Sequence, residues 1–139
     1  MAFERARFVA DPVAVRAALQ RFEQGAVLAS LGADHRDCLL LVLAEVLNNV
    51  AEHAYSGGSG PVTVSLRLCS GSAFARVVDR GVCAPPLGSG AGCDPLALPE
   101  GGFGTGLIRT LASGIVQHRR IGCNVLQFRV AADNSGRDA

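Results

Sequence analysis

The stretch "LVLAEVLNNVAEHAY", residues 41–55, decides the fold because an apolar helical pattern and a row of polar side chains coincide in it. Its leucines, valines and alanines are typical of a buried helix. Glu45, Asn49 and His53 follow one another at intervals of four residues, so they are expected to share one face of that helix. Burying a carboxylate and an amide costs free energy unless these groups are paired or used. Two interpretations remain open on spacing alone, a binding site and an ordinary solvated face.

The chemistry of these side chains suits a metal-assisted reaction. An amide oxygen, as in Asn49, is a hard ligand of the kind that Mg²⁺ accepts. A nearby carboxylate, as in Glu45, is able to take a proton from a hydroxyl group or from water.

The segments on both sides of this helix predict an α+β domain. Asp11 and Pro12 suit the start of a helix, and Ser70-Gly71 suits the turn of a hairpin. We expect a helical layer over one mostly antiparallel sheet, with residues 1–139 forming a single domain. The expected elements are a strand at 3–9, a helical segment at 11–32, a helix at 34–55, strands at 61–69 and 72–79, a loop at 80–104, a helical pattern at 105–115, strands at 115–122 and 124–132, and a frayed tail at 133–139.

Composition excludes several functions. The net charge is +1, the 13 basic residues are scattered along the sequence, and aromatic residues make up only 5%. We therefore expect neither a nucleic-acid groove nor a membrane patch. The N-terminus lacks the apolar run of a signal peptide, and no apolar run is long enough to span a bilayer. The five cysteines form no C-x-x-C pair, which favours reduced thiols and a cytoplasmic protein.

Two further motifs bear on function. In "VVDRG", residues 77–81, Asp79 ends an apolar strand and could accept a hydrogen bond from a ligand amine, while Gly81 leaves room for a flat ring. An ordinary turn is the alternative. In "EGGFGTGL", residues 100–107, several glycines precede a helix, and such loops direct backbone N–H groups at phosphate. A flexible linker is the alternative there, and neither the P-loop nor the dinucleotide fingerprint is present.

The three motifs in this order resemble the N-box, G1-box and G2-box of the gyrase, chaperone, histidine-kinase and mismatch-repair ATPase superfamily. The pattern E-x-x-x-N-x-x-x-H-x-Y, here Glu45 to Tyr55, and "GGFGTGL" are more similar still to the bacterial anti-sigma factor serine kinases. "GCNVLQFRV", residues 122–130, occupies the place of their final strand. The resemblance implies a Bergerat-type ATP-binding fold, a two-layer α/β sandwich with a mixed, mostly antiparallel sheet covered on one face by helices. Its glycine-rich ATP lid would span about 82–104.

The resemblance also implies a role for each residue. Glu45 would be the catalytic base, Asn49 would coordinate Mg²⁺, and Asp79 would bind the adenine amino group with Gly81 beside the ring. His53 would either contact a phosphate or pack within the helix. The complete expected ATP-binding set is Asn49, His53, Asp79, Gly81, Gly102, Gly104, Thr105, Gly106, Leu107 and Asn124. Two positions depart from the family pattern. No basic residue precedes the second glycine box, where Arg80 or Arg109 would have to substitute, and Asn124 stands where threonine is usual.

Partner switching is the activity that this resemblance implies. The kinase, usually a homodimer, binds a sigma factor or another target and phosphorylates a serine on a STAS-domain antagonist, using ATP and Mg²⁺. The lack of a basic residue before the glycines leaves open a nucleotide-gated binding module with little or no kinase activity. A stand-alone ATPase, in which Glu45 activates water, is a third possibility.

Overall fold

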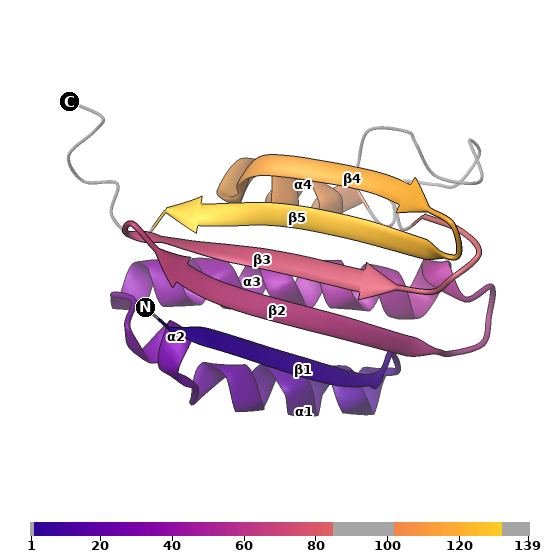
Figure 1. Cartoon of the computed structure of the whole chain (residues 1–139), viewed down its shortest axis with the longest axis horizontal. Helices are drawn as coiled ribbons and strands as arrows, with labels where there is room; N and C mark the ends of the chain where they lie inside the picture. Colours follow the sequence, from indigo (N-terminus) through magenta and orange to yellow (C-terminus); the bar gives the residue numbers. More distant parts are fainter. Residues whose placement is uncertain (1, 85–101, 132–139) are drawn as a thin grey trace.

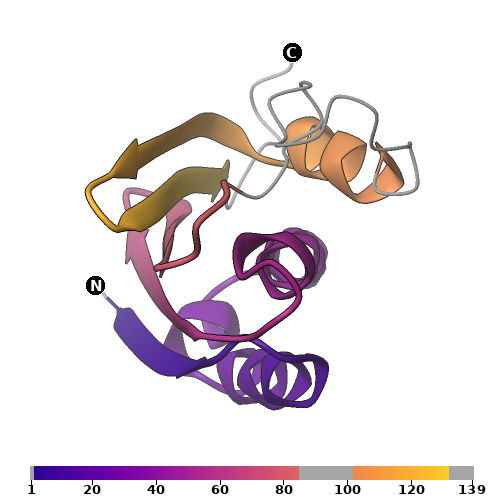
Figure 2. The same ribbon diagram turned by 90° about the vertical axis from the view of Figure 1, so that its right-hand side faces the viewer.

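The computed structural model describes residues 2–84 and 102–131, and its strands form one five-stranded sheet (Figure 1). The strand order is β1-β2-β3-β5-β4, and every described pairing is antiparallel, where a mixed sheet was expected. The described helices lie on one face of the sheet (Figure 2). The α+β fold class is thereby confirmed. The elements are β1 (Phe3–Val9), α1 (Pro12–Glu23), α2 (Ala26–Ala29), α3 (Ala33–Asn49), the π-helix η1 (Val50–Ala54), β2 (Pro61–Cys69), β3 (Ser72–Asp79), α4 (Gly102–Leu111), β4 (Ser113–Arg120) and β5 (Cys123–Ala131).

The strands follow from alternating side chains and tight turns. In β2, every second residue from Val62 to Leu66 is buried, so one face of this strand packs on the core. Ser70 and Gly71 both have positive φ angles, 53° and 77°, which is the turn geometry that suits a two-residue hairpin. The hairpin predicted at this turn is confirmed.

The helical segment expected at 11–32 divides into two helices. Asp11 caps α1 by accepting a hydrogen bond of 2.8 Å from the Ala14 backbone N–H. Helix α1 ends before Gly25, and α2 begins at Ala26. The Glu4 carboxylate on β1 accepts a 2.8 Å hydrogen bond from the Val27 N–H, which satisfies a backbone donor in the first turn of α2. The division depends on this contact with a distant strand, so local spacing did not indicate it.

Three boundaries differ from the expected ones. The helix expected at 34–55 has α geometry only as far as Asn49, and the π-helix η1 completes it. Helix α4 begins at Gly102, so the glycines that were expected in a loop before the helix belong to its first turns. The helical pattern expected as far as residue 115 ends at Leu111, and β4 begins at Ser113. Gly114 has a positive φ angle of 60° and lies beside a register shift between β4 and β5.

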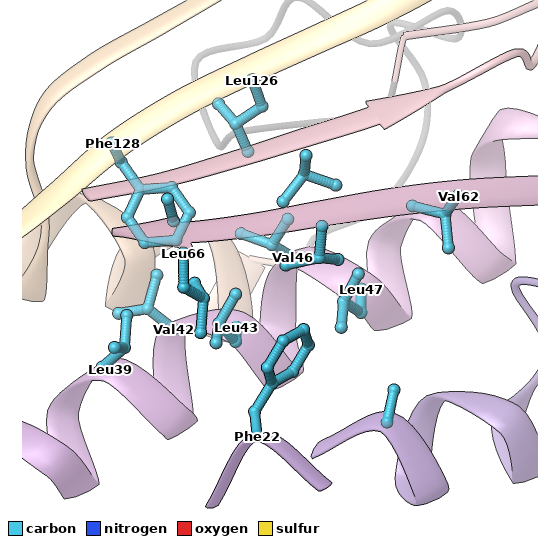
Figure 3. Packing of buried hydrophobic residues seen from close by; sticks show 14 of the residues in the cluster. Phe22, Leu39, Val42, Leu43, Val46, Leu47, Val62, Leu66, Leu126 and Phe128 are labelled. Atoms are coloured by element: carbon cyan, nitrogen blue, oxygen red, sulfur yellow. The ribbon is translucent and has the colours of Figure 1, made fainter. Parts of the chain in front are cut away.

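The core lies between the helices and the inner face of the sheet (Figure 3). Leu39, Leu43 and Leu47 form the buried stripe of α3, and they pack with Phe22 of α1 and Phe128 of β5. These side chains recur at intervals of four residues on α3, which places them on one side of the helix. Among the described residues, no helix is long and apolar enough to cross a membrane.

Replacing Phe22 with alanine is expected to lower the free energy of unfolding by about 3–5 kcal/mol, because the ring fills space in the core. Phe22 is only 1% exposed. Val13→Ala on the same helix is the matched control, since Val13 is 79% exposed and its loss should change stability by less than about 0.5 kcal/mol. Denaturant unfolding measures both variants, and equal effects would contradict the placement of α1.

Candidate functional site

Glu45 and Asn49 lie on the flank of α3 that faces α4. The Cys38 thiol marks this flank, because it donates a hydrogen bond to the Leu111 carbonyl of α4 with an S···O distance of 3.7 Å. Glu45 follows Cys38 by seven residues and Asn49 follows it by eleven. At 3.6 residues per turn, both positions fall within about 20° of Cys38 around the helix axis. Helix α4 packs against α3 (Figure 2), and the positions of Glu45 and Asn49 around the helix axis place them on that side.

Burial distinguishes these two residues from their neighbour. Asn49 is only 7% exposed and Glu45 is half-buried, whereas Asn48 is exposed. A solvated helix face would leave all three in water. The burial of Asn49 and the partial burial of Glu45 argue against an ordinary solvated face at these two positions, whereas Asn48 faces solvent.

The π-helix changes the position of His53. His53 lies in η1, where each turn closes on the fifth residue, so the helix around it is wider than the α-helix that the sequence predicts. The His53 side chain is 42% exposed, and its Nε2 lies 3.5 Å from the carboxylate of Glu52. The expectation that His53 extends the row of Glu45 and Asn49 stays a prediction. Single π-turns occur frequently at functional sites.

Asp79 is the centre of a second polar group, at the end of β3. The sheet register pairs Asp79 with Asn124 of β5. The Asp79 Oδ1 atom accepts hydrogen bonds of 2.7 Å from the Gly81 N–H and 2.7 Å from the Asn124 side-chain amide. The same Asn124 amide donates to the Cys83 carbonyl at 3.1 Å. Both hydrogen bonds described for this carboxylate are accepted by Oδ1.

Burial raises the pKa of the Asp79 carboxyl above its ordinary value. The Gly81 N–H, the Asn124 amide and the Arg119 guanidinium oppose that rise because they stabilise the charged form. Asp79 is only 2% exposed. Perturbed carboxylates of this kind gather at functional sites, although structural networks produce them as well.

Arg119 is the member of this group that the sequence analysis missed. Its Nη1 donates to the Asn124 Oδ1 at 2.6 Å and to the Gly81 carbonyl at 2.8 Å. The arginines considered from sequence were Arg80 and Arg109. The available signal was the tight turn at Ile121-Gly122, which sets the β4–β5 register and thereby places Arg119 opposite Asn124.

Backbone contacts join the end of η1 to the end of β3. A Cβ atom at Gly81 would overlap the Ala54 backbone, so this close approach requires glycine. The Tyr55 hydroxyl donates to the Pro61 carbonyl at 2.5 Å and accepts from the Arg80 N–H at 2.7 Å. These contacts bring the Asp79 group to the same end of the molecule as the C-terminal end of α3 (Figure 1).

The expected lid is described only in part. Gly102 and Gly104 lie in the first turn of α4, where backbone N–H groups have no partner within the helix. Gly106 is exposed and Leu107 is half-buried. Thr105 belongs to α4, but its side chain and residues 85–101 lie outside what the structure describes.

The state of the cysteines differs from the expected reduced thiols at one position. Cys38, Cys69 and Cys123 are free and half-buried, and burial raises the pKa of the Cys38 thiol. Cys83 is disulfide-bonded, so the expectation of reduced thiols throughout is wrong at this position. Cys93 lies outside the described residues.

Asp79→Asn is expected to preserve or raise stability at neutral pH, because an amide oxygen can still accept from Gly81 and Asn124 while the buried charge is removed. Folding raises the pKa of this carboxyl above its ordinary value of 3.8. The group therefore contributes its full stabilisation of the native state below pH 3.8, and this contribution is lost as the pH rises through the pKa of the folded protein. The stability of the variant relative to the wild type should therefore increase with pH above 3.8. Denaturant unfolding over a pH series measures the difference.

The control for this comparison is Asp37→Asn, at an exposed position of α3. It should show a much smaller dependence on pH. A wild type that gains stability over the Asp79→Asn variant as the pH rises would contradict the burial argument.

Tyr55→Phe is expected to cost about 1–3 kcal/mol, because it leaves the Pro61 carbonyl and the Arg80 N–H without their described partner. Thermal or denaturant unfolding measures the loss. A second readout uses the fact that Tyr55 is the only tyrosine in a chain without tryptophan. Burial raises its pKa above 10.0, so ionisation followed by ultraviolet absorbance should occur above the ordinary range in the folded protein. Ionisation at the ordinary pKa would be inconsistent with these contacts.

Comparison with known proteins places these features in a family. The model of the histidine kinase-like ATPase domain matches residues 8–130. The search of curated proteins gave no match. Among solved structures, the RsbU and RsbW domains of Rv1364c from Mycobacterium tuberculosis are similar, with a TM-score of 0.68 and 16% identity over 94% of this chain and 32% of that one.

Two structures of a blue-light activated histidine kinase from Erythrobacter litoralis EL346 are also similar. The first, its histidine kinase domain, gives a TM-score of 0.53 and 23% identity over 72% of this chain and 46% of that one. The second gives a TM-score of 0.59 and 19% identity over 88% of this chain and 41% of that one. This chain thus spans less than half the length of each of these solved chains, and at such identities the likeness concerns the fold. The family model covers most of the sequence and includes the regions of Glu45, Asn49 and Asp79. This chain belongs to the histidine kinase-like ATPase domain family.

Proposed function

We propose that residues 1–139 form an ATP-dependent serine kinase domain that also acts as a partner-switching regulator. It binds a sigma factor or another target, and it phosphorylates a serine on a STAS-domain antagonist. One observation carries the proposal: on the flank of α3 that faces α4, Asn49 is buried and Glu45 is half-buried. Membership of the ATPase family supports ATP as the phosphoryl donor. The RsbW domain in a similar solved structure supports the regulatory part.

The residues present fit a nucleotide. Asp79 offers a carboxylate oxygen as an acceptor for the adenine amino group, while Asn124, Gly81 and Arg119 hold the carboxylate in place. Asn49 supplies an amide oxygen for Mg²⁺, which commonly binds through few protein ligands together with phosphate oxygens and water. The first turn of α4 supplies backbone N–H groups suited to phosphate, with Gly102, Gly104 and Gly106 allowing close approach and Thr105 and Leu107 adjoining them.

The chemical role of the protein is mainly positioning. ATP with Mg²⁺ supplies an activated phosphoryl group whose charge is partly neutralised. Glu45 accepts the proton of the incoming serine hydroxyl, and its partial burial keeps its carboxylate away from competing water. The neighbouring side chains on α3 are apolar and packed in the core, so Glu45 is held on a rigid element.

The wider assembly belongs to the same proposal. The kinase works as a homodimer in the cytoplasm, and it exchanges its target for the antagonist according to whether that antagonist is phosphorylated. The support for these steps is the resemblance of the three boxes to partner-switching kinases. His53, exposed beside Glu52, is placed to contact a bound phosphate only if the side chain turns away from that carboxylate.

Asn49→Ala is expected to weaken Mg²⁺–ATP binding by at least about tenfold, since it removes a metal ligand. Asn48→Ala is the matched control, because it removes the same side chain from the adjacent, exposed position. Calorimetric titration with Mg²⁺–ATP, and with ATP in the presence of a chelator, measures both. Equal affinities for the two variants would remove Asn49 from the site, and failure of the folded wild type to bind would refute the proposal.

Glu45→Ala is expected to retain nucleotide binding and to lose transfer to a serine acceptor by about 10²–10⁴-fold, the usual contribution of a general base. Glu52→Ala, an exposed carboxylate on η1, should transfer at the wild-type rate. Labelled phosphate on a STAS-domain protein reports the reaction. Full transfer by the Glu45 variant would exclude Glu45 as the base.

A nucleotide-gated binding module is the second candidate, and the position of Arg119 favours it. This guanidinium binds the Gly81 carbonyl and Asn124, so it is occupied in fixing the Asp79 group. This second candidate predicts that the affinity for a partner differs between the ADP-bound and ATP-bound states, and that no partner acquires phosphoserine. A stand-alone ATPase would instead release phosphate steadily without a protein acceptor.

A further inference from the structure

The face of the sheet opposite the helices is uncovered in the described part of the chain (Figure 2). All described helices pack on the inner face, so the outward side chains of the strands have no described layer over them. A depression of about 640 Å³ lies on this outer face, across β1, β2, β3 and β5. An uncovered sheet face that is also hollowed is a candidate docking surface.

Arginines gather on this outer face. The register places Arg5 of β1 and Arg76 of β3 on either side of Ser65 of β2. One row away, Arg67 of β2 and Arg129 of β5 lie on either side of Phe74 of β3. All four arginines line the depression. They are scattered in the sequence, but alternate strand positions direct them to one side of the sheet.

Apolar surface accompanies the charge. Phe3 is 61% exposed and pairs with Arg67 across β1 and β2. The Arg67 guanidinium lies 5.2 Å from the centroid of the Phe74 ring. Arginines combined with aromatic side chains are typical of protein interfaces, where charge gives selectivity and apolar area gives affinity.

No carboxylate of the described residues neutralises this face. Glu4 points to the inner side, where it binds the Val27 N–H, and Asp79 is buried on the inner side as well. The close contact of His53 with Glu52 belongs to η1 and lies away from this face. A second copy of the same face would bring like charges together, which disfavours this surface as the contact between two copies.

We propose that the outer sheet face, defined by Arg5, Arg67, Arg76, Arg129, Phe3 and Phe74, docks an acidic polypeptide segment of a partner protein. Charge complementarity is the argument for its chemistry, because an arginine fork matches a carboxylate through two parallel hydrogen bonds. All 13 basic residues of the chain are arginine. This surface lies on the opposite side of the sheet from Glu45, Asn49 and Asp79, so the inference stands apart from the proposed kinase activity.

Nucleic acid fits the surface less well than an acidic polypeptide does. Proteins that bind nucleic acid through charge have a strongly basic domain, whereas the pI here is about 7.7 and the net charge is +1. Single strands also require free aromatic rings on which bases stack. The Phe74 ring is half-buried, and Arg67 lies over it.

The test measures binding of a fluorescent peptide that alternates glutamate and leucine, by anisotropy at physiological salt. The double variant Arg5→Ser and Arg76→Ser should weaken binding by about tenfold, since two partly exposed charge pairs are lost. Arg16→Ser with Arg21→Ser is the matched control, because it removes the same charge from exposed positions of α1. The control should retain wild-type affinity, and wild-type binding should weaken as salt is raised.

Several outcomes would overturn the proposal. These are no binding by the wild type, equal loss in both double variants, or preferential binding of an oligodeoxythymidylate that displaces the peptide. Concentration-dependent self-association that disappears only in the Arg5 and Arg76 variant would assign the face to a second copy instead. Denaturant unfolding and Mg²⁺–ATP titration of both variants show whether the fold and the nucleotide site are intact, so a failure here is distinguishable from failure of the kinase proposal.

Discussion

Helix α3 packs Leu39, Leu43 and Leu47 against the inner face of the sheet, and the rest of the structure depends on this contact. The buried stripe fixes the rotation of the helix about its axis. That rotation in turn fixes the direction of Glu45 and Asn49, which lie beside the stripe and face α4. The polar residues are therefore positioned by the apolar ones. A core helix is costly to rotate, so a carboxylate and an amide on its flank are held more precisely than they would be on a loop.

A second constraint acts at the end of β3, where the sheet buries the Asp79 carboxylate. Burial alone would favour the protonated acid, but Gly81, Asn124 and Arg119 supply donors or positive charge that oppose this effect. All of these groups depend on strand register, since β3 pairs with β5 and β5 with β4. Close packing of Gly81 on Ala54 then ties the group to the helix that carries Asn49. The two halves of the candidate site, distant in sequence, are thus joined by backbone contacts.

Local patterns sufficed to predict β1, β2, β3 and the hairpin at Ser70-Gly71, because alternation and turn chemistry act over a few residues. Local patterns failed where contacts between residues distant in sequence determine the structure. The division between α1 and α2 involves Glu4, and no local signal indicated the π-helix that carries His53. For the site, spacing alone placed Glu45 and Asn49 on one face. Arg119 was missed because its importance arises from the β4–β5 register and from its bonds to Gly81 and Asn124.

The two faces of the sheet require different kinds of residue. The inner face must be apolar to hold α3, and its polar exceptions, Asp79 and Asn124, are bonded to each other. The outer face need not be apolar, because no described layer packs on it. It carries arginines, and no described carboxylate lies beside them to balance their charge. A net charge of +1 conceals this asymmetry, because the acidic residues that the structure describes lie elsewhere. Mutual repulsion among the arginines costs stability, and an acidic partner would relieve it. A chain with one face committed to packing and the other left charged is suited to hold a nucleotide on one side and a polypeptide on the other.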